Sequence, residues 1–255
     1  MDKHTLPNIS IIGSGRVAKS LGAFFLSKGV PIKGIYSRNK ETGQACAALF
    51  KCPFFDKPSE LPGDMVLVAV ADDQTINIIT SIRPEQAVIY TAGSVDLSQI
   101  DHPNTGVFYP LQTFSGLDSD SQFDFPVLIE AKTDILVSKI KDLCQYCQLT
   151  YDLCNSQKRS NYHLVAVFMN NFINHVGHIA KTENDQRELN WEILKPLLDK
   201  TVFNILNNNT LSSQTGPATR NDISIIKKHE EMLDEQHLKV YQALTESIVK
   251  TMNSK

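Results

Sequence analysis

The sequence has no long apolar run, few cysteines and almost no excess of charge. No segment approaches the ~18 uninterrupted apolar residues of a membrane-spanning helix, and the first residues lack the apolar stretch of a signal peptide. The five cysteines are an odd number and widely spaced, which suits reduced thiols better than a disulfide framework. A net charge of -3 gives no basic field that would attract nucleic acid or anionic membranes. We therefore expect a soluble, cytoplasmic protein that binds neither.

The composition is that of a folded protein with one large domain or two modest ones. Its 255 residues are 42% hydrophobic and 21% charged, which is enough apolar material for a core. In the first half, short apolar segments alternate with helical patterns, and this alternation predicts βαβ crossovers and a parallel sheet covered on both faces. The expected strands are residues 9–12, 32–36, 65–70, 87–90, 106–109, 127–131 and 149–153, and the expected helices are residues 17–26, 41–50, 74–82 and 134–147.

The second half of the chain has a different character, which begins near residue 155. Almost no β pattern follows, and we expect helices at residues 157–182, 191–208, 222–233 and 235–252. We therefore divide the chain into an α/β domain, residues 1–154, and an all-α domain, residues 155–255. The polar break between them is short, so we expect the two domains to pack closely.

A glycine-rich motif follows the first predicted strand and opens a helix. Its G-x-G-x-x-A spacing lets Gly13 make a tight turn, lets Gly15 bring the backbone close to a pyrophosphate, and lets Ala18 pack against the strand. Free amides at the helix N-terminus then bind the anion. A glycine turn that binds nothing is the alternative, but the strand–turn–helix context favours a Rossmann-like, doubly wound dinucleotide-binding domain. We expect the cofactor to contact Gly13, Ser14, Gly15, Arg16 and Val17.

The end of the second predicted strand indicates NADP as the cofactor. An NAD enzyme places an acidic residue there to bind the ribose 2′-hydroxyl, but no carboxylate appears before Glu41. Ser37 can instead form a hydrogen bond with a 2′-phosphate, and Arg38 can bind that phosphate or stack on the adenine. The alternative for Arg38 is an ordinary solvated surface charge.

The segments that follow the later strands are candidates for the nicotinamide side, because open parallel sheets bind ligands beyond the carboxyl ends of their strands. Ala71 and Asp72 follow the third strand, although Asp72 also fits a simple helix cap. Ala92 and Gly93 lie in a small polar turn after the fourth strand, and Tyr109 ends the fifth. We expect the first four residues to contact the cofactor and Tyr109 to contact the substrate.

The long helix expected at residues 157–182 carries one polar stripe. At about 100° per residue, His163, Asn170, Asn174 and His178 fall on one side, and apolar residues cover most of the remaining circumference. Such a helix is expected to be mostly buried. Because buried amides and imidazoles need partners, the stripe faces a ligand cleft, a polar network, a twofold partner or solvent.

Two further clusters carry polar or reactive side chains. Arg220 is a bidentate donor suited to a substrate carboxylate, although a structural ion pair explains it equally well. Asp222 is expected to cap the helix that follows. Cys144 and Cys147 have the C-x-x-C spacing of some metal sites, but both fall on an apolar helical stripe, so we expect core packing and no metal.

Six segments together resemble one known family: residues 13–18, 90–94 and 109–115, the polar pairs at 162–163 and 170–171, and residues 215–222. They resemble a bacterial family of two-domain proteins with a Rossmann-like NADP-binding N-terminal domain and a helical C-terminal domain of unknown function. More distantly, the pattern is similar to pyrroline-5-carboxylate reductase, ketopantoate reductase and the 6-phosphogluconate dehydrogenase group. This resemblance implies a homodimer formed through the C-terminal helices. The family commonly has His-Pro where this chain has Tyr109-Pro110, so a phenol replaces one possible proton carrier.

These observations predict an NADP-dependent oxidoreductase that transfers a hydride between the nicotinamide and the carbonyl or imine of a small, carboxylated metabolite. His163 is the expected proton carrier, because imidazoles change charge near neutral pH, and Asn170 is the expected polarising group. Arg220, Asn174 and Tyr109 are expected to bind the substrate. A non-catalytic NADP-binding sensor or assembly module is the alternative, and a cleft for a different nucleotide is a third hypothesis.

Overall fold

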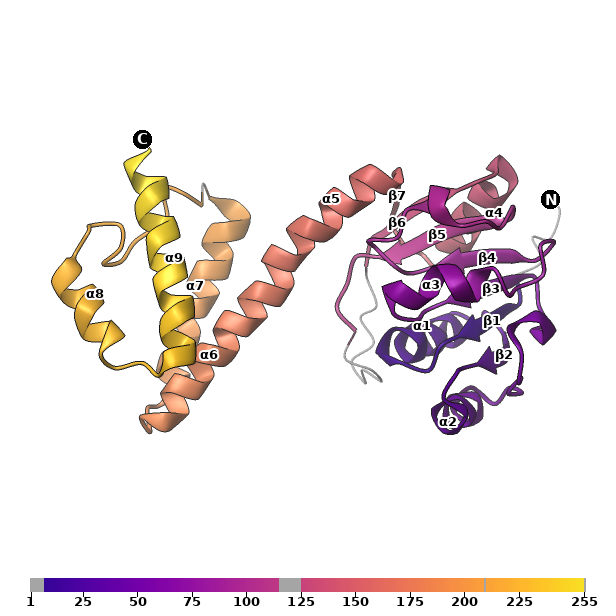
Figure 1. Cartoon of the computed structure of the whole chain (residues 1–255), viewed down its shortest axis with the longest axis horizontal. Helices are drawn as coiled ribbons and strands as arrows, with labels where there is room; N and C mark the ends of the chain where they lie inside the picture. Colours follow the sequence, from indigo (N-terminus) through magenta and orange to yellow (C-terminus); the bar gives the residue numbers. More distant parts are fainter. Residues whose placement is uncertain (1–6, 115–124, 209, 255) are drawn as a thin grey trace. The chain divides into compact units, whose positions relative to one another are not determined.

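The computed structural model describes residues 7–114, 125–208 and 210–254, and the chain forms two compact units, Met1–Asn171 and Phe172–Lys255 (Figure 1). The first unit contains a β-sheet and the second is helical, which confirms the predicted fold class. The units divide at residues 171 and 172, within the segment that the sequence predicts as one long helix. The predicted domain boundary, residues 154 and 155, lies just before α5 (Ser156–Ala166).

A seven-stranded sheet forms the centre of the first unit, with the strand order β2-β1-β3-β4-β5-β6-β7. Neighbouring strands pair in parallel, except that β5 and β6 are antiparallel. The chain first builds outward from β1 to β2 and then crosses back to β3, so the carboxyl end of β1 is the switch point at which open sheets bind ligands. The strands are β1 (Ile9–Ile12), β2 (Ile32–Tyr36), β3 (Met65–Val68), β4 (Ala87–Tyr90), β5 (Thr105–Pro110), β6 (Val127–Ala131) and β7 (Tyr151–Leu153).

Helices cover both faces of this sheet. All residues of β1, β3 and β4 are buried, which explains why these strands are continuous short runs with little polar character. Alternate strand residues enter two separate cores: Ile11 packs with Phe24 and Phe25 on one face, and Ile12 packs with Val66 and Ile79 on the other. The helices and short 3-10 segments of this sheet region are α1 (Arg16–Ser27), α2 (Lys40–Phe50), η1 (Pro58–Glu60), α3 (Asp72–Ile79), η2 (Leu97–Gln99) and α4 (Asp134–Tyr146).

Cys144 and Cys147 lie in the first of these two cores. Their side chains are 0% and 1% exposed, which confirms the predicted core packing. Burial raises the pKa of Cys144 to about 12 and that of Cys147 to about 11, so both groups stay protonated thiols at neutral pH.

A π-helix interrupts the helix that the sequence predicts at residues 157–182. α5 is followed by the π segment η3 (Val167–Phe172) and then by α6 (Ile173–Gln186). The prediction of one continuous α-helix is therefore wrong. Because a π turn closes i→i+5 instead of i→i+4 hydrogen bonds, every residue after it is rotated from its α-helical position. Asn174 consequently does not continue the stripe of His163 at the predicted angle.

The apolar side chains of this interrupted helix are exposed in the single chain. Phe168, Met169, Phe172 and Val176 are 59%, 56%, 50% and 43% exposed, so the expectation of a mostly buried helix is wrong. The two buried cores of the chain include none of these residues. An amphipathic pattern shows which side of a helix favours burial, but it does not show whether residues of the same chain pack against that side.

In the described residues, the second unit contains α6 and three further α-helices. Asp222 caps α8 by accepting a hydrogen bond from the Ile225 amide at 3.4 Å, as the sequence predicts. Glu183 of α6 accepts hydrogen bonds from Arg187 and from His237 of α9. Among the described residues, no helix is both long and apolar enough to cross a membrane. The elements that follow α6 are η4 (Trp191–Ile193), α7 (Lys195–Asn207), α8 (Ile223–Glu230) and α9 (Glu235–Asn253).

Candidate active site

The loop after β1 makes a turn that requires glycine at residue 13. Gly13 has a φ of +127°, a conformation that side chains disfavour. Its amide donates a hydrogen bond to the Tyr36 carbonyl at 2.8 Å, and a Cβ on Gly13 would lie 2.2 Å from the Ala69 carbonyl oxygen. The turn is therefore held tightly between the carboxyl ends of β2 and β3 before α1 begins.

Gly15, in contrast, is not required by the packing of the protein. It is exposed, and a Cβ on it would meet no atom of the described chain within 4 Å. Gly15 caps α1 without a side chain, and the first turn of α1 contains no acidic residue. The helix N-terminus therefore offers its amides to an open space, where the helix dipole favours an anion. This cradle fits a dinucleotide pyrophosphate, which would lie where a side chain would otherwise stand.

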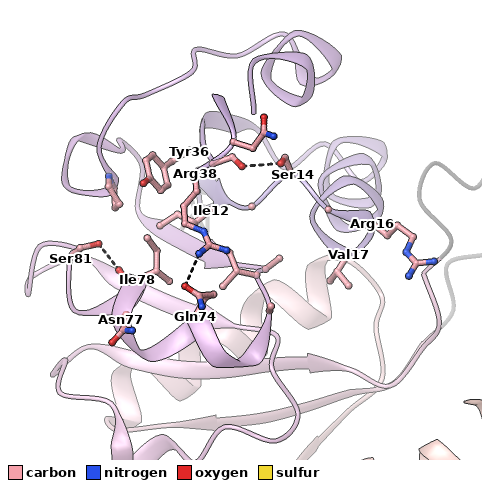
Figure 2. A pocket seen from close by; sticks show the side chains of 18 of the residues that line it. Ile12, Ser14, Arg16, Val17, Tyr36, Arg38, Gln74, Asn77, Ile78 and Ser81 are labelled. Atoms are coloured by element: carbon pink, nitrogen blue, oxygen red, sulfur yellow. Dashed lines mark hydrogen bonds between the residues drawn. The ribbon is translucent and has the colours of Figure 1, made fainter. Parts of the chain in front are cut away.

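A cavity of about 1120 Å³ extends from this loop across the carboxyl ends of β1, β2 and β3 (Figure 2). Its volume lies above the ~300–1,000 Å³ of most small-ligand pockets, in keeping with an extended ligand. Three of the eleven expected cofactor residues lie elsewhere: Asp72 is exposed at the start of α3, and Ala92 and Gly93 are buried after β4. The expected cofactor residues that line the cavity are Gly13, Ser14, Gly15, Arg16, Val17, Ser37, Arg38 and Ala71.

Three hydroxyl groups gather beside this cavity, where β2 ends. The Ser14 hydroxyl lies 2.9 Å from that of Ser37 and 2.8 Å from that of Thr42. Arg38 extends its guanidinium across the cavity and donates a hydrogen bond to Gln74 Oε1 at 2.7 Å (Figure 2). No carboxylate is among the described residues that line the cavity. Hydroxyl and guanidinium groups suit a phosphate, whereas a ribose diol is usually held by a carboxylate.

Several roles at this edge of the sheet escape the sequence patterns. Thr42 and Gln74 lie in the first turns of α2 and α3, and this position, directly after a strand and its loop, is the signal that could have identified them. Asp72 does not cap α3, because Ala71 is the N-cap and no side chain caps this helix. The Asp72 carboxylate instead accepts a hydrogen bond from the Ser94 hydroxyl, which joins the segments after β3 and β4.

A second cavity, of about 580 Å³, lies within the first unit at the end of β5 and is also lined by α5 and η3. Tyr109, His163 and Asn170 all line it. The Tyr109 hydroxyl and His163 Nδ1 are 2.9 Å apart, and the Asn170 amide donates a hydrogen bond to the Thr113 hydroxyl. The fold thus brings together three residues that the sequence predicts for catalysis or substrate binding, from segments more than fifty residues apart.

The pair formed by Tyr109 and His163 packs against Gly93. A Cβ on Gly93 would lie 2.9 Å from His163 Nδ1 and 2.9 Å from Tyr109 Cζ, so only glycine leaves room for the pair at its present position. Burial raises the pKa of Tyr109, and the Asp72 carboxylate raises it further. The phenol therefore stays protonated at neutral pH and can donate a hydrogen bond or a proton.

Asn174 and Arg220, the other two residues expected at the substrate, lie in the second unit. Asn174 is exposed on α6, and Arg220 is exposed in the turn before α8. The ion pairs in the described part of this unit do not include Arg220, so they do not support the structural alternative for its guanidinium.

Arg159 is a buried charged residue that the sequence patterns do not mark. Its side chain is 1% exposed and pairs with Glu130. The neighbouring Lys158 is exposed and pairs with Asp152 at 3.0 Å, which is the usual situation for a helix cation. Arg159 lies one turn before His163 on α5, on the side of the helix that carries the polar stripe, and this spacing is the signal that could have identified it.

Two family models match the two parts of the chain. Residues 7–83 match the model of an oxidoreductase family with an NAD-binding Rossmann fold, and residues 125–248 match the model of a domain of unknown function, DUF2520. These matches confirm the resemblance seen in the sequence, a Rossmann-like domain followed by a region of unknown function. No curated protein matches the sequence at a significant level.

Solved structures share the fold of nearly the whole chain. A "putative NADP oxidoreductase" from Bacteroides fragilis is 28% identical with a TM-score of 0.86, over 96% of this chain and 98% of that one. 1-Pyrroline-5-carboxylate reductase from Streptococcus pyogenes is 12% identical with a TM-score of 0.59, over 98% and 99% of the two chains. A reductive aminase from Aspergillus terreus, in complex with NADPH and ethyl-5-oxohexanoate, is 10% identical with a TM-score of 0.66, over 97% and 95%. The chain therefore has an NAD(P)-binding oxidoreductase fold.

Proposed function

From this NAD(P)-binding oxidoreductase fold, we propose that the protein is an NADP-dependent oxidoreductase that transfers a hydride between the nicotinamide and the carbonyl or imine carbon of a small metabolite. The observation that carries the proposal is the uncapped N-terminus of α1, where the empty Cβ position of Gly15 opens onto the larger cavity. A pyrophosphate there would accept hydrogen bonds from the first amides of α1. Neither the packing of the turn nor the cap of the helix otherwise requires a glycine at this position.

The choice of NADP rests on the groups beside the cavity at the end of β2. A 2′-phosphate would find the hydroxyls of Ser14, Ser37 and Thr42, of which the Ser14 hydroxyl already lies within hydrogen-bond distance of the other two. Arg38 is tied to Gln74 by one hydrogen bond between exposed side chains, which is weak enough to be exchanged for a charge-assisted bond to phosphate.

The second cavity supplies the groups that handle the proton. NADPH supplies the hydride, so the protein has to orient the substrate and move one proton. We assign the proton to His163, whose Nδ1 shares a hydrogen bond with the Tyr109 hydroxyl, and we assign the polarisation of the substrate oxygen or nitrogen to the Asn170 amide. Tyr109 contacts the substrate and keeps the imidazole oriented, because its raised pKa preserves the phenol as a donor.

The finer predictions on substrate and assembly belong to the same proposal. A carboxylate on the metabolite would bind Arg220, with Asn174 as a neutral partner, since both are exposed. The protein forms a homodimer through its C-terminal helices, where Leu197, Leu198 and Phe203 of α7 are 66%, 52% and 52% exposed. Exposed apolar groups of this size mark association surfaces. The cytoplasmic location stays a prediction.

Calorimetric titration with NADPH and NADH tests the cofactor site. We expect preferential binding of NADPH. Gly15→Ala should leave the free energy of unfolding unchanged, because the new Cβ enters empty space. It should lower the affinity for both cofactors by about tenfold or more, because the new Cβ stands where the pyrophosphate would approach. Arg38→Ala should weaken NADPH selectively. If the protein binds neither NADPH nor NADH, the proposal is refuted.

Turnover is tested by following NADPH absorbance with a panel that contains pyruvate, cyclohexanone and the cyclic imine 1-pyrroline. We expect consumption of NADPH with at least one member and a loss of about 10²-fold or more for His163→Asn if this residue carries the proton. Tight NADPH binding without turnover across the panel would instead favour the non-catalytic sensor. Sedimentation equilibrium tests the dimer.

A further inference from the structure

Arg159 is the only lysine or arginine that is buried among the described residues. A buried guanidinium loses its hydration, and its burial is tolerated only when its charge and its donors are satisfied. The Glu130 carboxylate supplies the charge, and the Ser156 hydroxyl adds a hydrogen bond at 3.1 Å. Because the side chain is only 1% exposed, Arg159 cannot itself contact a substrate.

The other N–H groups of Arg159 donate hydrogen bonds to the turn that follows β4. Nε donates to the Gly93 carbonyl at 3.3 Å, and Nη2 donates to the Val95 carbonyl and to the Tyr90 hydroxyl at 3.4 Å. The Tyr90 hydroxyl donates in turn to the Val95 carbonyl at 3.0 Å. The backbone from residue 90 to residue 95 therefore curls around one guanidinium, which fixes the position of Gly93.

Gly93 is also the residue against which the two proton-handling groups rest. Its Cβ position lies 2.9 Å from His163 Nδ1 and 2.9 Å from Tyr109 Cζ. Arg159 and His163 are four residues apart on α5, so both side chains leave the same face of the helix. One helix thus carries the group that holds the turn and the imidazole that packs against it.

We propose that Arg159 is a positioning residue that sets the turn after β4 and, through Gly93, the hydrogen-bonded pair Tyr109–His163. The proposal rests on the proposed function, in which this pair handles the proton, and on the expectation from the sequence that the segment after β4 lies on the nicotinamide side of the cofactor. A lysine at this position keeps the charge but loses the planar fork of donors, so it satisfies Glu130 and releases the carbonyls of the turn.

The test compares Arg159→Lys with the neighbouring control Lys158→Gln, which removes an exposed cation from the same helix. Two ligands are titrated: NADPH, and 2′-phospho-ADP-ribose, which contains the adenosine half and the pyrophosphate but no nicotinamide. We expect Arg159→Lys to lower the affinity for NADPH by about tenfold relative to that for 2′-phospho-ADP-ribose, and to lower kcat by about tenfold or more for any panel member that the wild type reduces. Lys158→Gln should leave both quantities unchanged.

The proposal is overturned if the ratio of the two affinities does not change, whether both affinities fall equally or neither falls. A purely structural arginine would affect the binding of both ligands equally. If Arg159→Lys does not fold, Ser156→Ala removes one hydrogen bond from the guanidinium, together with the bonds of the same hydroxyl to the Leu97 amide and to Glu130. It should shift the same ratio in the same direction by a few-fold. Failure of the wild type to bind 2′-phospho-ADP-ribose contradicts the proposed function, whereas normal wild-type binding with an unchanged ratio in both variants contradicts only the role of Arg159.

Discussion

The substitution Gly93→Ala adds one methyl group at the most crowded point of the candidate active site. Gly93 does not have a positive φ, so alanine meets no backbone strain there and the effect is purely steric. The new Cβ would stand 2.9 Å from His163 Nδ1 and 2.9 Å from Tyr109 Cζ, distances that real Cβ atoms essentially never show, and 3.0 Å from Tyr109 Cε2. The clashing atoms belong to the Tyr109 and His163 rings, so relief of the contact requires a ring to turn away from the hydrogen-bonded position that the pair now has. Overpacking of this kind costs roughly 1–3 kcal/mol.

Urea unfolding, followed by the signal of the first unit, measures this cost, and steady-state turnover measures its effect on the pair. We expect a loss of unfolding free energy of about 1–3 kcal/mol, or, if the rings separate to relieve the contact, a smaller loss together with a fall in kcat of about tenfold or more. Gly177→Ala on α6, in the second unit, is the control: its Cβ would meet nothing within 4 Å, so it should leave the unfolding of the first unit unchanged and stabilise its own helix by about 0.5–1 kcal/mol. A Gly93→Ala protein with the stability and turnover of the wild type would refute the steric reasoning.

Three further outcomes follow from the described contacts. Asp222→Ala should destabilise the second unit by about 0.5–2 kcal/mol in urea unfolding, because α8 loses its N-cap. Glu183→Gln should cost about 1–3 kcal/mol in the same assay, since the carboxylate that accepts from His237 and one neighbouring guanidinium loses its charge. Burial raises the pKa of Cys144 to about 12 and of Cys147 to about 11 from an ordinary 9.0. The folded state therefore keeps these protons to a higher pH than the unfolded state does. The free energy of unfolding should be highest below pH 9 and should fall as the pH rises through 11, by about 2–3 kcal/mol for Cys144 alone. The variant Cys144→Ala should show a weaker dependence on pH.

The architecture of the first unit could be predicted because its signals are local. The strand expected at residues 87–90 is β4 (Ala87–Tyr90), and that at 127–131 is β6 (Val127–Ala131), since consecutive apolar residues between turns have few other uses. The turn at Gly13 was equally predictable, because its positive φ is a property of the motif itself. Each of these features is decided within about ten residues of sequence.

The π segment and the buried arginine could not be predicted in the same way. A projection at about 100° per residue assumes α-helical geometry throughout, so it places Asn174 beside His163 and cannot register the extra residue per turn in η3. Arg159 and Lys158 look alike in sequence, and only tertiary contacts separate them. The partners that make one cation buried, Glu130 and the turn at Gly93, are 29 and 66 residues away in the chain.

The arrangement of the candidate site follows from strand order more than from any single motif. β3, β4 and β5 are adjacent and parallel, so the segments that follow them reach the same edge of the sheet. That adjacency places Asp72 against Ser94, and Gly93 against Tyr109, although no sequence pattern links these positions. The helix α5 lies at this edge. Its Arg159 donates a hydrogen bond to the turn after β4, and its His163, one turn later, lines the second cavity. A chain with the same glycine motif but a different strand order would still have the open helix N-terminus, but it would not bring these groups together.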